Sequence, residues 1–524
     1  MRPRPGLDCK EMDKFYITTP LYYVNSTPHI GHSYTNIACD ALARYKRLTG
    51  YEVLFSTGSD EHGQKIKDVA ESKAIDPKVF VDSIVPVFKE LWKQLDITYD
   101  DFIRTTEKRH EDVVRDALNT LYKNGDLYEG EYSGWYCTPC ESFWTKVQLV
   151  DDLCPDCRRK VEEIKEKNFF FRLSKYQSWL IDYINSHEDF IKPAIRKNEI
   201  LSFLKNPLND LCVSRPRSRL SWGIDIPFSK DHVTYVWFDA LLNYISVCGY
   251  KDNPEKFKKF WPADIHVIGK DILRPHTVYW PIMLHAIGLE LPRTVFAHGW
   301  WKVGGDKMSK SKGNAIDPGS MVSRFGVDAY RLFLLKEVQF GADGSFSEEA
   351  LIARINSDLA NDLGNLLHRT LTMVEKYFAG SIPERRDLKY SEEITKALIN
   401  KACLLDSEIK NGMDNIDFSY SLNSIWGVIN TANKFIEQKA PWKLAKENKQ
   451  DELKDMMYDL CEILRMVSVA LMPFMPDTSI KIAGQLGLEN AENRNFSDLK
   501  WGLLKPGTKI NKGKPLFPRI DTTT

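Results

Sequence analysis

A pair of histidines near the start of the chain has the spacing of a phosphate-binding turn. His29 and His32 lie on either side of Gly31, and Pro28 precedes them. Imidazole N–H groups can donate hydrogen bonds to phosphate oxygens, and a glycine lets a ligand approach the backbone. Because a four-residue match is a weak signal, ordinary surface histidines remain an equal alternative at this point. A second feature is needed to decide between them.

A loop of lysines provides that feature. Lys307, Lys310 and Lys312 fall within six residues, and glycines lie on both sides of this segment. A mobile loop of ammonium groups can close over a polyphosphate and stabilise the charge that develops when a phosphate bond breaks. A run of charge is usually a solvated surface, which is the alternative here. The coincidence of the loop with the histidine turn favours nucleotide chemistry.

Strand and helix patterns place both segments at the edge of a parallel sheet. Residues 15–19 are β-branched and aromatic and predict a strand before the histidine turn, and apolar residues at helical spacing over 37–48 predict a helix after it. Such a helix points its free N–H groups and its dipole at a bound anion. Further strands are predicted at 51–57, 264–271 and 293–299, and their polar ends lie where α/β sheets bind ligands.

Four of the ten cysteines form two CxxC pairs, Cys137 with Cys140 and Cys154 with Cys157. Four thiolates at this spacing can converge tetrahedrally on zinc. Two disulfides or a redox dithiol are the alternatives, and neither suits a reducing compartment. We therefore expect one Zn²⁺ that supports the fold, because four cysteine ligands leave no open position for chemistry.

The bulk composition is that of an ordinary globular chain. Basic and acidic side chains balance at 72 each, so any nucleic-acid surface must be local. No apolar run is long enough to cross a bilayer, and the first residues lack the apolar segment of a secretory signal. The first ten residues are also too short for a convincing organellar signal. We expect a cytoplasmic protein with no membrane contact.

The histidine turn and the lysine loop, His-Ile-Gly-His and Lys-Met-Ser-Lys-Ser, together form the double motif of the class I aminoacyl-tRNA synthetases. Beyond it, the chain resembles the methionyl-tRNA synthetases over nearly its whole length. The matching segments are 20–32, 57–63, 235–244, 269–272, the lysine loop, 361–369 and 440–442. The resemblance implies an α/β fold: a Rossmann-like parallel-sheet catalytic domain with a zinc-knuckle insertion, then an all-α helical-bundle anticodon-binding domain.

Changes in the sequence pattern divide the chain into five expected segments. The zinc pairs and an aromatic run at 169–171 interrupt the strand–helix alternation, and long amphipathic patterns begin after about 346. The segments are the first half of the catalytic domain (1–115), the connective insertion (116–230), the second half of the catalytic domain (231–294), the lysine loop with a stem-contact region (295–345), and the helical anticodon-binding domain with its tail (346–524).

The resemblance also implies a methionine pocket at nine positions. These are Pro20, Leu21, Tyr23, Asp60, Trp237, Ala240, Tyr244, Ile272 and His276. Aromatic rings hold a soft thioether well, and a carboxylate can bind the substrate ammonium group. Without the family match, Trp237 and Tyr244 would more readily be ordinary core residues.

The implied reaction activates L-methionine with ATP to methionyl-adenylate and transfers it to the 3′ end of tRNA(Met), for translation initiation and elongation. No side chain acts as a nucleophile, so catalysis is positioning and charge stabilisation. Mg²⁺ would accompany ATP. The implied ATP contacts are His29, Gly31, His32, Gly269, Asp271, Lys307, Ser309 and Lys310, and the catalytic residues among them are His29, His32, Lys307 and Lys310.

The helical domain is expected to bind the anticodon. The resemblance implies contacts from Asn365, Arg369 and Trp442, whose amide, guanidinium and indole suit unstacked bases, although each could be an ordinary helix-surface residue. In the expected helix, Asp358 shares a polar face with Asn365, opposite a leucine face. No added C-terminal module follows the bundle, so we expect a monomer.

Four alternatives share part of this pattern. Synthetases for isoleucine, valine and leucine carry an editing insertion larger than fits between the two motifs. Cysteinyl-tRNA synthetase places zinc in its amino-acid site and lacks the Trp237 and His276 pattern. A nucleotidylyltransferase has no need of the helical domain, and a non-catalytic tRNA-binding paralogue has no need of intact motifs.

Overall fold

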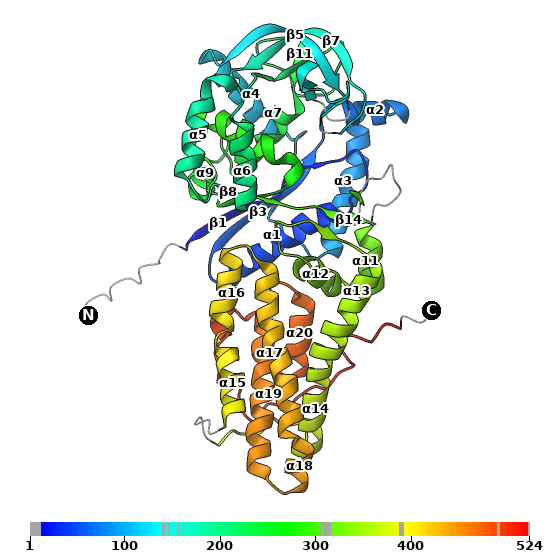
Figure 1. Cartoon of the computed structure of the whole chain (residues 1–524), viewed down its shortest axis with the longest axis vertical. Helices are drawn as coiled ribbons and strands as arrows, with labels where there is room; N and C mark the ends of the chain where they lie inside the picture. The colour runs from blue at the N-terminus through cyan, green and yellow to red at the C-terminus, as the bar shows by residue number, and fades with distance from the viewer. Residues whose placement is uncertain are drawn as a thin grey trace, which may run out of the picture.

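The computed structural model describes residues 12–138, 142–144, 146–155, 157–303, 306–307, 316–386, 392–489 and 493–521. An α/β part and a bundle of helices lie end to end along the long axis of the molecule (Figure 1). Among the described residues, no helix combines the length and the apolar character that crossing a bilayer requires.

A parallel seven-stranded sheet is the centre of the α/β part. Its order is β2–β3–β1–β12–β13–β8, and β4 also pairs with β3. The strands are β1 (Lys14–Thr18), β2 (Tyr22–Tyr23), β3 (Glu52–Asp60), β4 (Asp101–Arg104), β8 (Ile191–Lys192), β12 (Ile265–Gly269) and β13 (Val295–His298). The four predicted strands are confirmed, since β1, β3, β12 and β13 cover them. Apolar runs buried in the middle of the sheet are typical of parallel strands covered on both faces.

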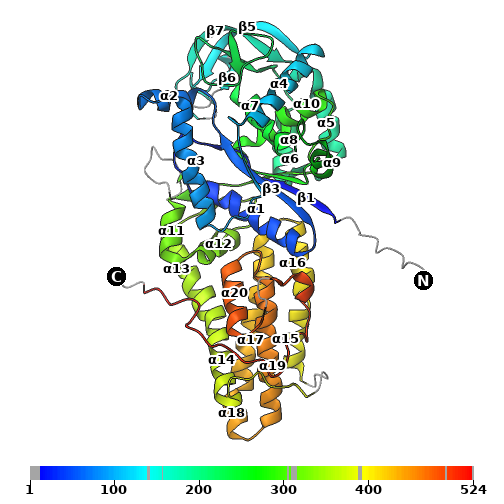
Figure 2. The same ribbon diagram turned by 180° about the vertical axis from the view of Figure 1, so that it is seen from behind.

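Helices cover the sheet and lie at its carboxyl ends. They are α1 (Ile30–Leu48), α2 (Gln64–Ser72), α3 (Pro77–Gln94), α4 (Lys108–Lys123), α7 (Val236–Leu241), α8 (Asn243–Val247), α9 (Pro254–Phe260) and α10 (Trp280–Ala286), with short turns η3 (Lys270–Ile272) and η4 (Pro275–Tyr279). The helix predicted after the histidine turn is confirmed as α1, which lies between the sheet and the bundle (Figure 2).

The stretch that interrupts the alternation builds a second, antiparallel sheet. Its strands, in the order β6–β5–β7–β9, are β5 (Leu127–Cys137), β6 (Ser142–Trp144), β7 (Glu162–Phe171) and β9 (Leu211–Cys212). Helices α5 (Gln177–Ser186) and α6 (Ala194–Phe203) lie between β7 and β9 in the chain. A small pair, β10 (Ser214–Pro216) with β11 (His232–Thr234), follows the sheet. The same stretch contributes β8, which pairs with β13 at the edge of the parallel sheet.

The segment around the lysine loop forms a small three-stranded sheet and two helices. The strands are β14 (Trp301–Val303), β15 (Asp306–Lys307) and β16 (Gly344–Ser345), in the order β15–β14–β16. Between β15 and β16 lie α11 (Pro318–Phe325) and α12 (Val327–Lys336). Residues 308–315, which include Ser309 and Lys310, lie outside the described residues.

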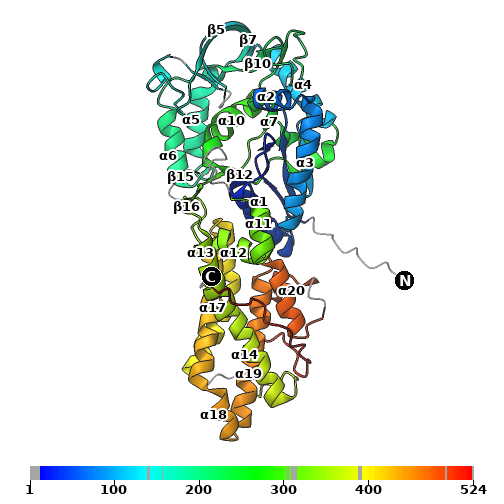
Figure 3. The same cartoon turned by 90° about the vertical axis from the view of Figure 1, so that its right-hand side faces the viewer.

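The bundle confirms the helices expected after 346. It consists of α13 (Glu348–Arg354), the π-helix η6 (Ile355–Gly364), α14 (Asn365–Phe378), α15 (Glu393–Cys403), α16 (Leu405–Asp414), α17 (Phe418–Lys439), α18 (Pro441–Lys446), α19 (Gln450–Ala470) and α20 (Pro476–Gln485). The C-terminal segment runs back along the bundle (Figure 3), and Ile520 and Asn356 exchange hydrogen bonds of 2.8 and 2.9 Å there.

One expectation for this part is wrong. Asp358 does not lie on an exposed polar face: it is buried and binds Lys336 at 2.6 Å and Arg354 at 3.1 Å. The reason is the π-helix over 355–364, whose wider turn rotates the following side chains relative to an α-helix. The leucines at 359, 363, 366 and 367 are buried as expected.

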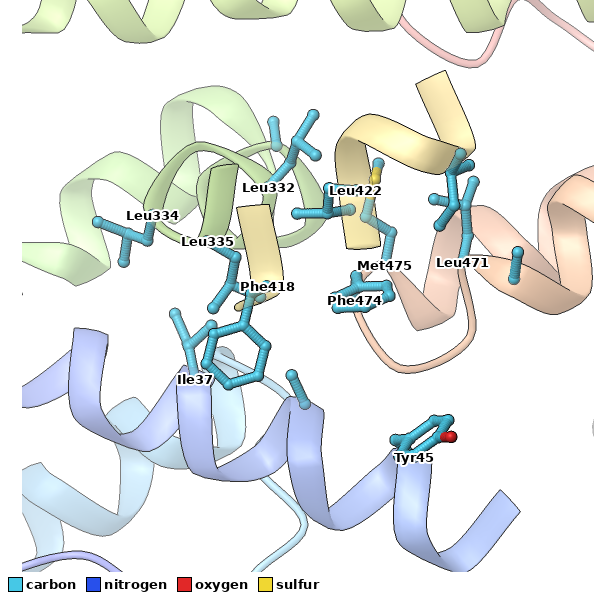
Figure 4. Close-up of a cluster of buried hydrophobic side chains, with 14 of the residues drawn as sticks. Ile37, Tyr45, Leu332, Leu334, Leu335, Phe418, Leu422, Leu471, Phe474 and Met475 are labelled. Atoms are coloured by element: carbon cyan, nitrogen blue, oxygen red, sulfur yellow. The ribbon is translucent and has the colours of Figure 1, made fainter. Parts of the chain in front are cut away.

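The α/β part and the bundle share one core. Ile37 of α1, Leu335 of α12, Phe418 of α17 and Phe474 after α19 belong to a single buried cluster (Figure 4). The fully buried Arg331 of α12 donates to Asp40, at 2.7 Å, and to the carbonyl groups of Leu95, Pro473 and Phe474. These contacts join the helix that begins at the histidine turn directly to the bundle.

Candidate active site

A cavity of about 380 Å³ opens at the carboxyl ends of the parallel strands. All nine positions expected for the amino-acid pocket line it, together with His29, Gly31, His32, Gly269 and Asp271 from the expected ATP contacts. The sheet explains this meeting, because parallel strands bring their carboxyl ends to one edge. The histidine turn and the aromatic pocket therefore belong to one site.

The two histidines of the turn are fixed by the backbone of α1. Gly31 N–H donates to His29 Nδ1 at 3.1 Å, and His29 N–H donates to His32 Nδ1 at 3.1 Å. Both Nδ1 atoms are thus acceptors, which places the proton of each neutral ring on Nε2. A Cβ at Gly31 would lie 3.0 Å from His29 Cε1 and would press on this arrangement. The turn therefore holds two imidazole N–H donors at the start of a helix.

The amino-acid end of the cavity has an aromatic, uncharged wall. Tyr244 O–H donates to His276 Nε2 at 2.8 Å, because His276 Nδ1–H donates to the carbonyl of Ile272 at 2.9 Å. Burial lowers the pKa of His276 to about 4, so its ring is neutral near pH 7. His266 stacks on the far face of Tyr244 with a centroid distance of 4.1 Å. This wall suits an apolar thioether rather than a charged side chain.

A buried carboxylate also lines the cavity and is followed by a buried histidine–aspartate network. Asp60 ends β3 and is 7 % exposed. Two residues later, His62 Nδ1 lies 2.7 Å from Asp239 Oδ2, and Asp239 Oδ1 lies 2.7 Å from His110 Nε2. Burial alone would raise the pKa of Asp239, but the two imidazoles lower it. Because Asp239 lies in α7 with Trp237, this chain of contacts ties the segment after Asp60 to the aromatic wall.

Four further residues that the sequence did not suggest also line the cavity: Thr35, Lys65, His298 and Trp300. Thr35 of α1 lies 2.8 Å from His298 Nε2, and Trp300 Nε1 donates to Asp271 at 3.1 Å. The available signal for His298 was a polar residue at the carboxyl end of a buried strand, since it is the last residue of β13.

The lysine loop is only partly described. Lys307 belongs to β15, whose backbone pairs with Lys302 of β14, and β14 begins at Trp301 beside the cavity. The loop is therefore attached at the nucleotide end. The expected contacts at Ser309 and Lys310 lie outside the described residues.

Three of the four expected metal ligands meet. The sulfur atoms of Cys137, Cys154 and Cys157 lie within 4.8 Å of one another, and Cys137 Sγ is 3.5 Å from Cys157 Sγ. Cys140 lies outside the described residues. Three converging thiols could hold a soft metal ion such as zinc.

The expected anticodon residues lie on the bundle, far along the chain from the cavity. Asn365 is exposed at the start of α14, and Trp442 of α18 is 45 % exposed. Arg369 of α14 binds Glu437 of α17 at 2.7 Å, five residues before Trp442. The structure thus places an amide, a guanidinium and an indole on accessible helices of the bundle.

Comparisons with known proteins agree with this geometry. The family model "tRNA synthetases class I (M)" matches residues 15–163 and 159–371, and the model "Anticodon binding domain of methionyl tRNA ligase" matches 383–524. The methionine–tRNA ligase of Caldanaerobacter subterraneus subsp. tengcongensis is 55 % identical over 509 residues, which cover 97 % of this chain and 79 % of that relative. The enzyme of Clostridium acetobutylicum is 52 % identical over 98 % of this chain and 79 % of its own length.

A solved structure of a methionyl-tRNA synthetase also resembles this chain. The Mycobacterium tuberculosis methionyl-tRNA synthetase in complex with methionyl-adenylate superposes with a TM-score of 0.92 at 40 % identity, over 97 % of this chain and 100 % of that one. The apo form of that enzyme superposes with a TM-score of 0.86. With two family models covering most of its length and relatives above 50 % identity, the chain belongs to the methionyl-tRNA synthetase family of class I aminoacyl-tRNA synthetases.

Proposed function

We propose that this chain is a methionine–tRNA ligase: it activates L-methionine with ATP to methionyl-adenylate, with release of pyrophosphate, and transfers methionine to the 3′ end of tRNA(Met). The observation that carries the proposal is the single cavity that holds both the imidazole N–H donors and the neutral aromatic pocket. The reaction needs an amino acid and a nucleotide side by side, and this cavity brings both sets of groups together.

Methionine binds at the aromatic end. Asp60 binds its ammonium group, and the thioether lies against Trp237, Tyr244 and His276. Pro20, Leu21, Tyr23, Ala240 and Ile272 complete the pocket. In this position the substrate carboxylate faces the nucleotide end and can attack the α-phosphate without help from a side-chain nucleophile.

ATP binds at the start of α1. The Nε2–H groups of His29 and His32 donate hydrogen bonds to phosphate oxygens, and Gly31 lets the nucleotide approach the backbone closely. Gly269 and Asp271 lie at the end of β12, where Asp271 binds the ribose. Lys307, Ser309 and Lys310 cover the triphosphate, and the two lysines stabilise the pentacovalent phosphate and the leaving pyrophosphate. Mg²⁺ enters with ATP and neutralises part of the triphosphate charge.

Asn365, Arg369 and Trp442 bind the anticodon bases of tRNA(Met). Trp442→Ala removes a stacking surface of the kind worth about 1–3 kcal/mol per base. We expect a tenfold or greater loss of kcat/KM in aminoacylation. ATP–pyrophosphate exchange, which needs no tRNA, should stay at the parent rate. Undiminished charging of initiator tRNA by the variant would remove this assignment.

Cys137, Cys140, Cys154 and Cys157 hold one structural zinc ion. Three converging sulfur atoms support the proposal, and in the sequence Cys140 completes the CxxC pair that begins at Cys137. We expect about one zinc per chain by elemental analysis, and removal by a chelator should lower the melting temperature. A chain that is purified without zinc and keeps its full melting temperature would contradict it.

The remaining expectations complete the proposal. The chain acts as a cytoplasmic monomer without a membrane partner, and its segments divide at 115, 230, 294 and 345. Among the alternatives, the synthetases for isoleucine, valine and leucine and the cysteinyl-tRNA synthetase would each activate a different amino acid. Pyrophosphate exchange that depends on methionine tests the function directly, and exchange supported by cysteine or a branched aliphatic amino acid would reassign it.

A further inference from the structure

Asp343 lies where three segments around the nucleotide end of the cavity meet. Its Oδ1 accepts hydrogen bonds from Lys270 Nζ at 2.6 Å and from the backbone N–H of Trp300 at 2.9 Å. Its Oδ2 lies 3.0 Å from Lys302 Nζ. Burial alone would raise the pKa of Asp343, but these donors hold it well below the usual range of a carboxyl group. Asp343 is therefore an anion that two ammonium groups share.

The indole of Trp300 contacts both one of these ammonium groups and the neighbouring carboxylate. Lys270 Nζ lies 4.2 Å from the centroid of the Trp300 ring. At the edge of the same ring, Trp300 Nε1 donates to Asp271 Oδ1 at 3.1 Å. Lys270 and Asp271 are adjacent in η3, and only Asp271 lines the cavity. Lys270 is thus held by Asp343 and by the face of the indole, whereas Asp271 accepts the indole N–H.

A partly buried ammonium group needs a carboxylate partner. The Lys270 side chain is 17 % exposed, and Asp343, which does not line the cavity, supplies that partner. Without Asp343, the nearest carboxylate along the chain is that of Asp271. An ion pair between Lys270 and Asp271 would neutralise the carboxylate and occupy oxygens that would otherwise accept hydrogen bonds.

We propose that Asp343 is a positioning residue that draws the Lys270 ammonium group away from Asp271 and so keeps this carboxylate available to the ribose of the nucleotide. The inference rests on the proposed function, in which Asp271 is the ribose-binding group. Through Lys302 and Trp300, the same aspartate also holds β14, the strand that leads into the lysine loop. Asp343 acts through these neighbours and does not itself touch substrate.

The test compares Asp343→Asn with the double variant Asp343→Asn/Lys270→Gln. A neutral amide no longer attracts Lys270, so we expect the KM for ATP to rise about tenfold in the single variant while the KM for methionine stays within twofold. Removal of Lys270 as well should return the KM for ATP to within threefold of the parent value. A residue with a purely structural role would not show this rescue, because the second substitution removes another contact.

Asp264 provides a matched control at the opposite end of β12. It also joins two cations and one backbone N–H: Lys14 Nζ at 3.2 Å, Arg293 Nη1 at 3.0 Å and the N–H of Tyr16 at 2.8 Å. Asp264→Asn should lower the melting temperature and leave the KM for ATP unchanged. An equal rise in the KM for ATP in this control would mean that the effect of Asp343→Asn is general destabilisation.

Two further measurements keep the outcomes distinct. Isothermal titration of each folded variant with Mg·ATP gives the Kd for ATP and does not depend on catalysis. If the parent shows no methionine-dependent exchange, the proposed function fails, but the comparison of Kd values still tests the role of Asp343. If Asp343→Asn does not fold, Asp343→Ser is tested in its place, alone and together with Lys270→Gln, and we expect the same loss and rescue of ATP binding. Unchanged ATP binding in the folded single variant, or no rescue in the double variant, overturns the proposal.

Discussion

Replacement of His32 by asparagine is expected to lower the kcat of methionine-dependent ATP–pyrophosphate exchange by about 10²–10³-fold, the cost typical of losing one donor to a developing oxyanion. The asparagine carboxamide oxygen can still accept the N–H of His29, as His32 Nδ1 does, so the start of α1 keeps its cap. The donor lost is the Nε2–H group on the far side of the ring. The KM for methionine should stay within threefold.

His32→Gln is the matched control for this position. Its longer side chain can place an amide N–H close to the position of Nε2, so it should retain more exchange activity than His32→Asn by at least tenfold. Equal rates for the two variants would mean that loss of the Nε2–H donor does not explain the effect of His32→Asn. A parent-like rate in His32→Asn would remove the histidine turn from the reaction.

The second large effect is expected at Lys310. Lys310→Ala should slow adenylate formation by about 10³-fold, because it removes a cation that stabilises the pentacovalent phosphate and the leaving pyrophosphate. Methionine binding should be unaffected, since the aromatic pocket lies at the other end of the cavity. Single-turnover formation of methionyl-adenylate measures the chemical step, and equilibrium dialysis measures methionine binding.

Lys312→Ala is the control within the same loop. It removes one positive charge from a residue that we place outside the reaction, and it should cost less than threefold. If both alanine variants lose the same activity, the loop acts through its total charge and not through Lys310. Unchanged exchange in Lys310→Ala would refute its role.

Much of the site can be predicted from the sequence because parallel strands bring the residues at their carboxyl ends to one edge of the sheet. The residues after β1, β3 and β12 were expected to meet, and they do line one cavity. The underlying signals are local: a strand pattern that ends in polar residues, and a helix pattern that begins at His29. The family match then supplies Trp237 and Tyr244, whose residue types alone would suit an ordinary core.

The supporting contacts did not follow from sequence, for two physical reasons. Asp343 is separated from Lys270 by more than seventy residues, and only the tertiary fold brings them together. The same holds for His110 beside Asp239. The buried position of Asp358 had a different cause, since the π-helix at 355–364 breaks the 3.6-residue periodicity on which the helix face was assigned.

The most direct test of the central claim is ATP–pyrophosphate exchange by the purified chain with different amino acids. If the imidazole donors and the aromatic pocket serve one reaction in one cavity, methionine should support exchange strongly. Cysteine, leucine, isoleucine and valine should support it at least a hundredfold less. Exchange that is independent of methionine, or that another of these amino acids supports better, would contradict the assignment of the cavity to methionine activation.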